Sequence, residues 1–204
     1  MSNSVTSSFY ALKSLQTYTH TAKGSKFIAY ARNISSVETA ESYLKELKQE
    51  HPKARHHCYA YRLGEQGENS RINDDGEPSG TAGLPIYNQI QSFELSNTIV
   101  VVVRYFGGTL LGVSGLIKAY KEATHGALLN APTKRLIPAR TLSLNIDYPH
   151  VNALMQIIER HRLLIVHQEM GMQCHYRLRY PLSLKAQLEQ ELNAIESLSL
   201  LNSD

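Results

Sequence analysis

The run Thr98-Ile-Val-Val-Val-Val103 constrains the fold of this 204-residue chain more than any other segment. Its five apolar residues are all β-branched, which favours a strand over a helix. Its length suits a strand and is far below the roughly 20 apolar residues that a membrane helix needs. We therefore expect residues 98–105 to form a buried central strand, and we expect no membrane insertion.

Periodicity and turn signals predict the other elements of the first 130 residues. Residues 26–31 and 55–62 have the pattern of strands. A capping box of Ser35 and Glu38 predicts the start of a helix. Residues 64–83 are dense in turn formers and predict a long loop without helix or strand. A short helix is expected at 84–93 and a longer one up to about residue 130, and the first 14 residues are expected to fray or to add an edge strand.

The rest of the chain follows a different pattern, beyond an expected linker at residues 132–138. Strands and helices are predicted there in the order βαββαβ, at residues 141–148, 150–162, 163–169, 173–180, 183–196 and 198–201. This order is that of the split-βαβ, ferredoxin-like fold. We therefore expect an α+β protein of two domains, residues 1–135 and residues 136–204.

The composition is that of an ordinary globular protein, with 42% hydrophobic and 19% charged residues. The net charge of +3 and the pI near 8.8 are too weak by themselves to indicate nucleic-acid binding. The first 137 residues hold 15 Lys and Arg against 11 Asp and Glu, so the basic excess lies in the first domain. The two cysteines lack a metal spacing and no secretory leader is evident, which predicts a cytoplasmic protein without a metal or cofactor.

A glycine-rich turn between the central strand and the following helix is the first candidate site. Glycines let backbone N–H groups approach a ligand, and the N-terminus of a helix attracts anions, so phosphate is the expected ligand. The spacing fits neither a Walker loop nor a dinucleotide fingerprint. The glycines could instead only permit close packing of helix and sheet. The four glycines are Gly107, Gly108, Gly112 and Gly115.

An acidic loop at residues 73–83 is the second candidate. Its carboxylates Asp74, Asp75 and Glu77 could bind a metal or act as acid and base, although their spacing fits no calcium loop. A tight turn with solvated acids explains them equally well. Ser79 and Thr81 add hydroxyls that could contact a backbone phosphate.

The segment Arg55-His56-His57-Cys58 is the third candidate. On a strand, His56 and Cys58 share one face and His57 lies on the other, so two side chains at most could ligate one metal. Two ligands are too few for a zinc site without help from elsewhere, and His125 is the other nearby candidate in this domain. We expect Cys58 to be a small buried residue and not a nucleophile.

Basic and aromatic residues are interleaved across this region, as in proteins that bind single-stranded RNA. We expect Arg55, His57, Arg104 and Lys118 to contact phosphates and Tyr105 to stack on a base. The alternative is that the rings complete a core and the charges solvate its rim.

Four segments together resemble the signature of the IMPACT family, and specifically of its bacterial YigZ-like branch. They are Ala54-Arg-His-His-Cys-Tyr-Ala-Tyr61, Asn73-Asp-Asp-Gly-Glu-Pro-Ser-Gly-Thr-Ala-Gly83, Val101-Val-Val-Arg-Tyr-Phe-Gly-Gly108 and Leu111-Gly-Val-Ser-Gly-Leu-Ile-Lys-Ala-Tyr120. The resemblance implies that the first domain is like the second domain of a small-subunit ribosomal protein, whose fold occurs in RNA-binding proteins. It also implies that the second domain resembles domain V of elongation factor G. It assigns no catalytic residue, and its eukaryotic members regulate translation under stress.

Three functions follow from these patterns. The favoured one is a translation-associated regulatory protein without enzymatic activity, which binds RNA or a ribosomal surface through its first domain. The alternative is an enzyme or binding protein for a phosphorylated small molecule, with phosphate on the glycine-rich turn and a divalent ion or proton on the acidic loop. The third is a surface that docks a protein partner.

Overall fold

The computed structural model describes residues 9–65 and 67–201. The part of the expected N-terminal edge strand that falls on residues 1–8 lies outside these described residues. The chain divides into two compact units, one of residues Phe9–Leu136 and one that holds the residues from Ile137 onward. Each unit combines helices with antiparallel sheet, so the expected α+β class is confirmed.

The first unit is built on a five-stranded antiparallel sheet in the order β2-β3-β6-β4-β5. Its central strand β6 (Thr98–Tyr105) has the bounds that the valine run predicts. Three helices accompany the sheet, and a separate two-stranded sheet pairs β1 with β7. The other elements are β1 (Phe9–Leu12), β2 (Gln16–Ala22), β3 (Ser25–Asn33), α1 (Val37–Glu50), β4 (His56–Leu63), β5 (Asn69–Asn73), α2 (Gly83–Ser92), α3 (Gly112–Leu128) and β7 (Thr133–Leu136).

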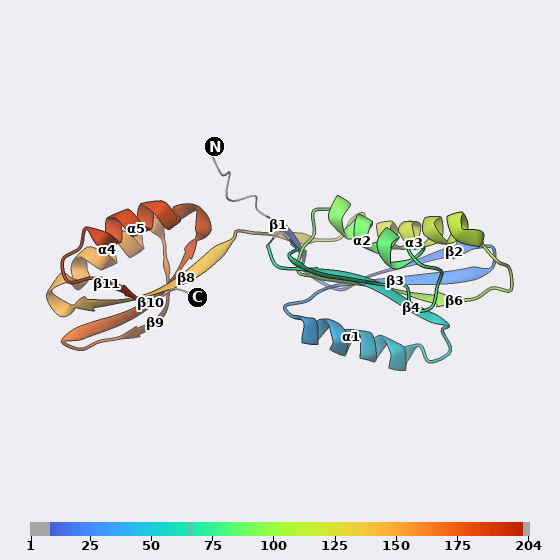
Figure 1. Cartoon of the computed structure of the whole chain (residues 1–204), viewed down its shortest axis with the longest axis horizontal. Helices are drawn as coiled ribbons and strands as arrows, with labels where there is room; N and C mark the ends of the chain where they lie inside the picture. The colour runs from blue at the N-terminus through green and yellow to red at the C-terminus, as the bar shows by residue number, and fades with distance from the viewer. Residues whose placement is uncertain (1–8, 66, 202–204) are drawn as a thin grey trace. The chain divides into compact units, whose positions relative to one another are not determined.

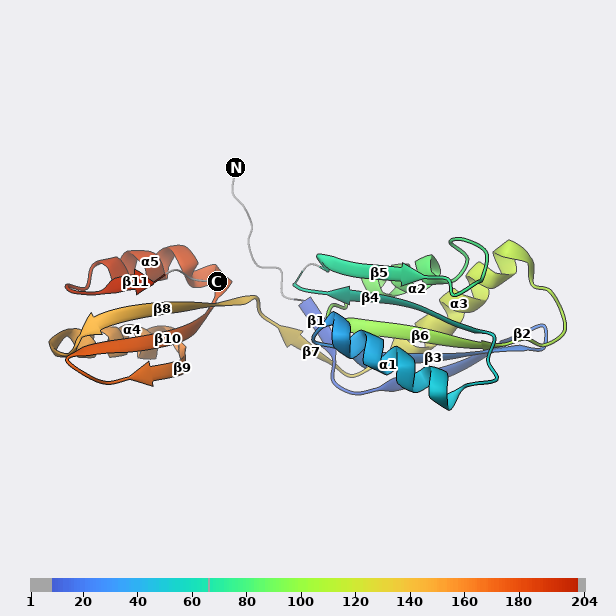
Figure 2. The same cartoon turned by 60° about the horizontal axis from the view of Figure 1, so that its bottom comes forward.

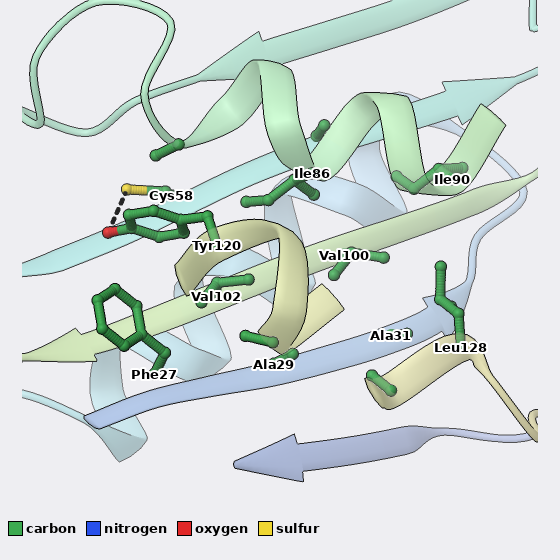
Figure 3. Packing of buried hydrophobic residues seen from close by; sticks show 14 of the residues in the cluster. Phe27, Ala29, Ala31, Cys58, Ile86, Ile90, Val100, Val102, Tyr120 and Leu128 are labelled. Atoms are coloured by element: carbon green, nitrogen blue, oxygen red, sulfur yellow. Dashed lines mark hydrogen bonds between the residues drawn. The ribbon is translucent and has the colours of Figure 1, made fainter. Parts of the chain in front are cut away.

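Helices cover both faces of this sheet, which explains why β6 is apolar at successive positions. Val100 and Val102 point to the face under α2 and α3, where Phe27 and Tyr120 also pack (Figure 3). The alternate residues Ile99, Val101 and Val103 point to the face under α1 (Figures 1 and 2). All five apolar residues of the strand are fully buried. A fully buried side chain of this size contributes about 1.5–3 kcal/mol to folding.

Three local predictions in the first unit are wrong. The expected loop at 64–83 contains strand β5, an exposed edge strand that pairs with β4. The expected linker contains β7, which pairs with β1 and so belongs to the first unit. Helix α1 is capped by Ser36, one residue after the expected position. The Ser36 hydroxyl accepts the N–H of Thr39, and the Thr39 hydroxyl accepts the N–H of Ser36.

The second unit has the expected βαββαβ order, with a short 3-10 turn before each helix. Its antiparallel sheet has the order β11-β8-β10-β9, as in ferredoxin-like folds. The core lies between one face of the sheet and both helices. Within the described residues, no helix has the length and apolar character to cross a membrane. The elements are β8 (Ala139–Asp147), α4 (Val151–His161), β9 (Leu164–Glu169), β10 (Gln173–Pro181), α5 (Lys185–Asn193) and β11 (Ser199–Leu201).

Candidate functional site

A cavity of about 360 Å³ lies where β4 begins, β6 ends and α3 begins, beside the acidic loop. This volume falls in the roughly 300–1,000 Å³ range of small-molecule sites. One part of its lining is polar and the other is apolar. The polar residues are Arg55, His56, Glu77 and Arg104, and the others are Pro78, Phe106, Leu110, Leu111, Gly112, Val113 and Leu116.

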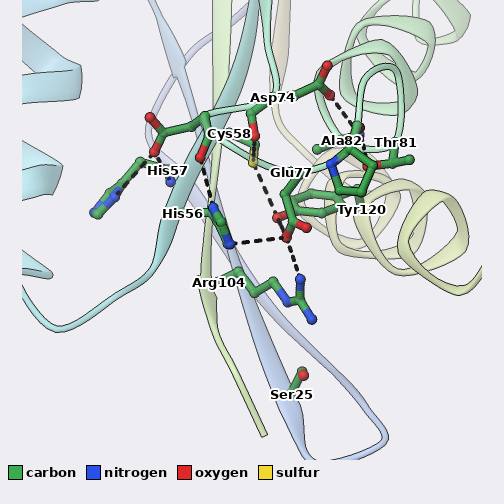
Figure 4. A network of polar contacts seen from close by, with 12 residues as sticks. Ser25, His56, His57, Cys58, Asp74, Glu77, Thr81, Ala82, Arg104 and Tyr120 are labelled. Carbon is green, nitrogen blue, oxygen red and sulfur yellow. Dashed lines mark hydrogen bonds and ion pairs between the residues drawn. The ribbon is translucent and has the colours of Figure 1, made fainter. Parts of the chain in front are cut away.

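Glu77 is the centre of the polar part of the cavity. Its side chain is only 4% exposed, and its Oε1 accepts hydrogen bonds from Arg104 Nη1 at 2.5 Å and the Tyr120 hydroxyl at 2.8 Å (Figure 4). His56 Nε2 lies 3.9 Å from the same oxygen. His56 Nδ1 is 2.8 Å from the carbonyl oxygen of Asp75. Because a carbonyl oxygen only accepts, Nδ1 carries a proton.

Tyr120 and Cys58 extend this network into the core. The Cys58 Sγ lies 3.0 Å from the carbonyl oxygen of Asp74 and 3.2 Å from the Tyr120 hydroxyl oxygen, so its single S–H proton has two acceptors within reach. Burial raises the pKa of the Cys58 thiol, and burial likewise raises the pKa of the Tyr120 hydroxyl. Both groups are therefore uncharged in the folded protein. This agrees with the expectation that Cys58 is a small buried residue and not a nucleophile.

Arg104 is buried, in contrast to the surface position that phosphate binding to RNA suggests. The residue is 6% exposed and its charge is balanced by Glu77. Its guanidinium carbon lies 5.4 Å from the centre of the Phe27 ring and 5.7 Å from that of Phe106. Its Nε is buried and has no hydrogen-bond partner among the described residues. Because Arg104 is part of the lining, a ligand in the cavity can contact it.

Arg55 and Phe106 form the outer part of the cavity. Arg55 is exposed, and its guanidinium carbon lies 5.9 Å from the centre of the Phe106 ring. Phe106 is 42% exposed, and Leu110 beside it is 81% exposed. Exposed apolar side chains of this size next to an exposed arginine are typical of a binding surface.

The three carboxylates of the acidic loop do not converge. Asp74 caps the start of α2, since its Oδ1 accepts the N–H groups of Ala82 at 3.0 Å and Gly83 at 2.9 Å. Asp75 accepts the N–H of His57 at 2.7 Å. Within the described residues, no three His, Cys, Asp or Glu side chains gather as a metal site would require.

The two hydroxyl residues of the loop lie outside the cavity lining. Thr81 is buried and donates to the carbonyl oxygen of Pro78 at 2.6 Å, so its hydroxyl stabilises the loop itself. Ser79 is exposed to solvent.

At most positions of the glycine-rich turn, the structure explains why the residue is glycine. A Cβ on Gly107 would overlap the backbone of Gly24, so only glycine fits there. Gly108 and Gly112 have positive φ angles of 87° and 74°, and a Cβ on Gly115 would crowd Leu111 at 3.0 Å. Close packing thus accounts for Gly107 and Gly115, whereas Gly108 and Gly112 have open space around them. Phosphate binding at this turn stays a prediction; Gly112 begins α3 at the cavity, and no described side chain caps that helix.

Two predicted contact residues point away from the cavity. His57 packs on the α1 side of the sheet, where burial lowers its pKa, and the Tyr105 hydroxyl bonds to His51 at 2.9 Å. His56 and Phe106, their neighbours in sequence, line the cavity instead. Strand alternation placed His56 and Cys58 on one face and His57 on the other, but it gave no signal for which face holds the cavity. Lys118 is exposed on α3 and is not part of the lining.

Comparisons with known proteins agree with the motifs around this cavity. The family model described as the Impact N-terminal domain matches residues 23–128. An IMPACT family member of Haemophilus influenzae is 35% identical over 168 residues, which cover 81% of each chain. IMPACT family member YigZ of Escherichia coli is 36% identical over 138 residues, covering 67% of this chain and 68% of that protein.

A solved structure extends the similarity to both units. The crystal structure of an hypothetical protein is 29% identical, with a TM-score of 0.72 over 98% of this chain and 99% of that chain. The motifs, the matched domain and the coverage of these relatives together place the chain in the IMPACT family, with the bacterial YigZ among its relatives.

Proposed function

We propose that this protein is a cytoplasmic, translation-associated regulatory protein that binds RNA or a ribosomal surface through its first unit. The resemblance to the IMPACT family suggests the link to translation. The observation that carries the proposal is the cavity beside Glu77, where two arginines, an exposed aromatic ring and the start of helix α3 lie together. Arginine with an aromatic ring is the usual combination for single-stranded RNA.

The contact residues of this proposal differ from those expected at first. Arg55 and Arg104 stay in the proposal and Phe106 takes the place of Tyr105. His57 is no longer a contact, because His57 and Tyr105 lie under α1. Lys118 stays in the proposal as an exposed cation on α3.

The test is co-sedimentation of the purified protein with ribosomes and with single-stranded RNA across a salt series. Arg55→Gln is the informative variant, because Arg55 is exposed and the substitution should not disturb the fold. We expect weaker binding, and a slope of log affinity against log salt that is flatter by about 0.7 for each phosphate that the variant no longer neutralises.

Arg71→Gln is the matched control. Arg71 is also exposed, but it lies on β5 and forms a 4.0 Å surface ion pair with Glu41 outside the cavity. Its replacement should change neither affinity nor slope measurably. The proposal fails if the wild-type protein binds neither ribosomes nor RNA at low salt.

A further inference from the structure

We propose that the cavity beside Glu77 holds one nucleoside 5′-monophosphate unit, either as the end of an RNA strand or as a free nucleotide. This inference rests on the proposed function and names the part of the ligand that the site recognises. Three features of the cavity carry it: a place for an anion, an acceptor for polar hydrogens and an apolar wall for a base.

The place for the anion lies at the start of α3. Gly112 and Val113 line the cavity in the first turn of this 17-residue helix, which has no side-chain cap among the described residues. Backbone N–H groups of a first helical turn have no partner within the helix and attract phosphate.

A second observation concerns the charge of the lining. Arg104 lines the cavity, is 6% exposed and has a buried Nε without a partner among the described residues. Its charge is balanced by Glu77, while Arg55 adds a second positive charge to the lining. The lining therefore carries a net positive charge before the partial charge of the helix is added.

The acceptor is the second carboxylate oxygen of Glu77. Its Oε1 takes the contacts from Arg104, Tyr120 and His56, and no described residue donates to Oε2. A carboxylate oxygen in a cationic site accepts hydrogen bonds from ribose hydroxyls or from an exocyclic amino group of a base.

The apolar wall is what distinguishes a nucleotide from inorganic phosphate or a sugar phosphate. Phe106, Leu111, Val113 and Leu116 form the apolar part of the lining, and the centre of the Phe106 ring lies 5.7 Å from the guanidinium carbon of Arg104 and 5.9 Å from that of Arg55. A nucleobase can pack its flat face on such a wall, and a ring contact of this kind is a common mode of RNA recognition. A polyhydroxylated sugar has no apolar face of that size.

The test is thermal denaturation and calorimetric titration with the four ribonucleoside 5′-monophosphates, with the nucleosides and inorganic phosphate as separate probes. We expect at least one monophosphate to raise the Tm saturably, and the nucleosides and phosphate to bind at least tenfold more weakly. Arg55→Gln should weaken monophosphate binding about tenfold, as expected for a hydrogen bond to a charged group. Arg71→Gln should leave it within about twofold, because that charge lies outside the cavity.

Val113→Asp provides a variant that should fold well and still lose the ligand. Val113 is 59% exposed, and an acidic residue in the first turn stabilises a helix. The new carboxylate, in the first turn of α3, would repel a phosphate bound to the N–H groups of that turn. An unchanged monophosphate affinity in folded Val113→Asp would overturn the proposed position of the phosphate.

RNA oligonucleotides with and without a 5′-phosphate separate the two sources of the ligand. Tighter binding of the 5′-phosphorylated strand, with competition by the monophosphate, would support an RNA end as the ligand. Binding of monophosphate alone, without ribosomes or RNA, would support a free nucleotide and would overturn the proposed function. Binding of RNA or ribosomes, with no response to millimolar monophosphate, would overturn this inference and leave the proposed function standing.

Discussion

Arg104 should be essential to stability, and its replacement should cost far more than that of a surface arginine. The side chains of Arg104 and Glu77 are 7% and 4% exposed, so Arg104→Met leaves a buried carboxylate without its counter-ion. Removing one partner of a buried ion pair costs about 3–5 kcal/mol. The Tyr120 hydroxyl still donates to Glu77, so we expect the lower end, about 3 kcal/mol. For a unit of this size that corresponds to a fall in Tm of roughly 10 °C.

The assay is urea denaturation of four proteins: wild type, Arg104→Met, Glu77→Gln and the double variant. The double variant removes both charges, so it should recover at least about 2 kcal/mol relative to the sum of the single losses. Arg71→Met is the control and should cost less than about 1 kcal/mol. An Arg104→Met protein as stable as the control, or single losses that simply add, would contradict a stabilising buried ion pair between Arg104 and Glu77.

Three further predictions concern the turn, the thiol and the histidine. Gly107→Ala should lower the free energy of unfolding by about 1–3 kcal/mol more than Gly108→Ala does, because a Cβ at Gly107 would overlap the backbone of Gly24, whereas one at Gly108 meets open space and carries only the cost of a positive φ; equal urea midpoints would contradict this. Cys58 should resist alkylation at pH 8 in the native protein, because burial raises the pKa of its thiol, and peptide mapping that finds native Cys58 labelled as fast as in urea would disprove it. Burial lowers the pKa of His57 below the value of about 6.5 that it has in the unfolded chain. The stability that neutral His57 contributes is therefore complete above that pKa and is lost as the pH falls from there through the lower pKa of the folded state. The free energy of unfolding should therefore fall less steeply from pH 7 to pH 5 in His57→Gln than in wild type, and parallel curves would argue against it.

The sequence predicts well those elements whose apolar residues form the core. The apolar run of β6 predicts its bounds, and the apolar periodicity of the second unit predicts the order of its elements. Edge strands do not carry such a signal. In β5 only Ile72 is apolar, and that residue is 41% exposed. The pairing of β5 depends on backbone groups of β4, which the local sequence pattern of β5 does not reveal.

In the candidate site, too, the position of single side chains depends on contacts that the local sequence does not reveal. Alternation predicts that His56 and His57 point to opposite faces, but it does not say which face holds the cavity. That depends on where the acidic loop and the start of α3 pack. The burial of Arg104 also depends on Glu77, a partner 27 residues earlier in the chain. The sequence therefore predicts the segments of the site but not which of their side chains meet.

The pairing of β1 with β7 has a consequence for how this protein emerges from the ribosome. Phe9 pairs with Leu136, which is synthesised 127 residues later. At the usual elongation rate of about 5–20 residues per second, that interval is roughly 6–25 s. During this time Ala11 and Leu12, which are fully or almost fully buried in the finished protein, have no complete core to enter. Strand β1 is thus among the last strands of the first unit to be placed, and this unit completes its fold only as the second begins to appear.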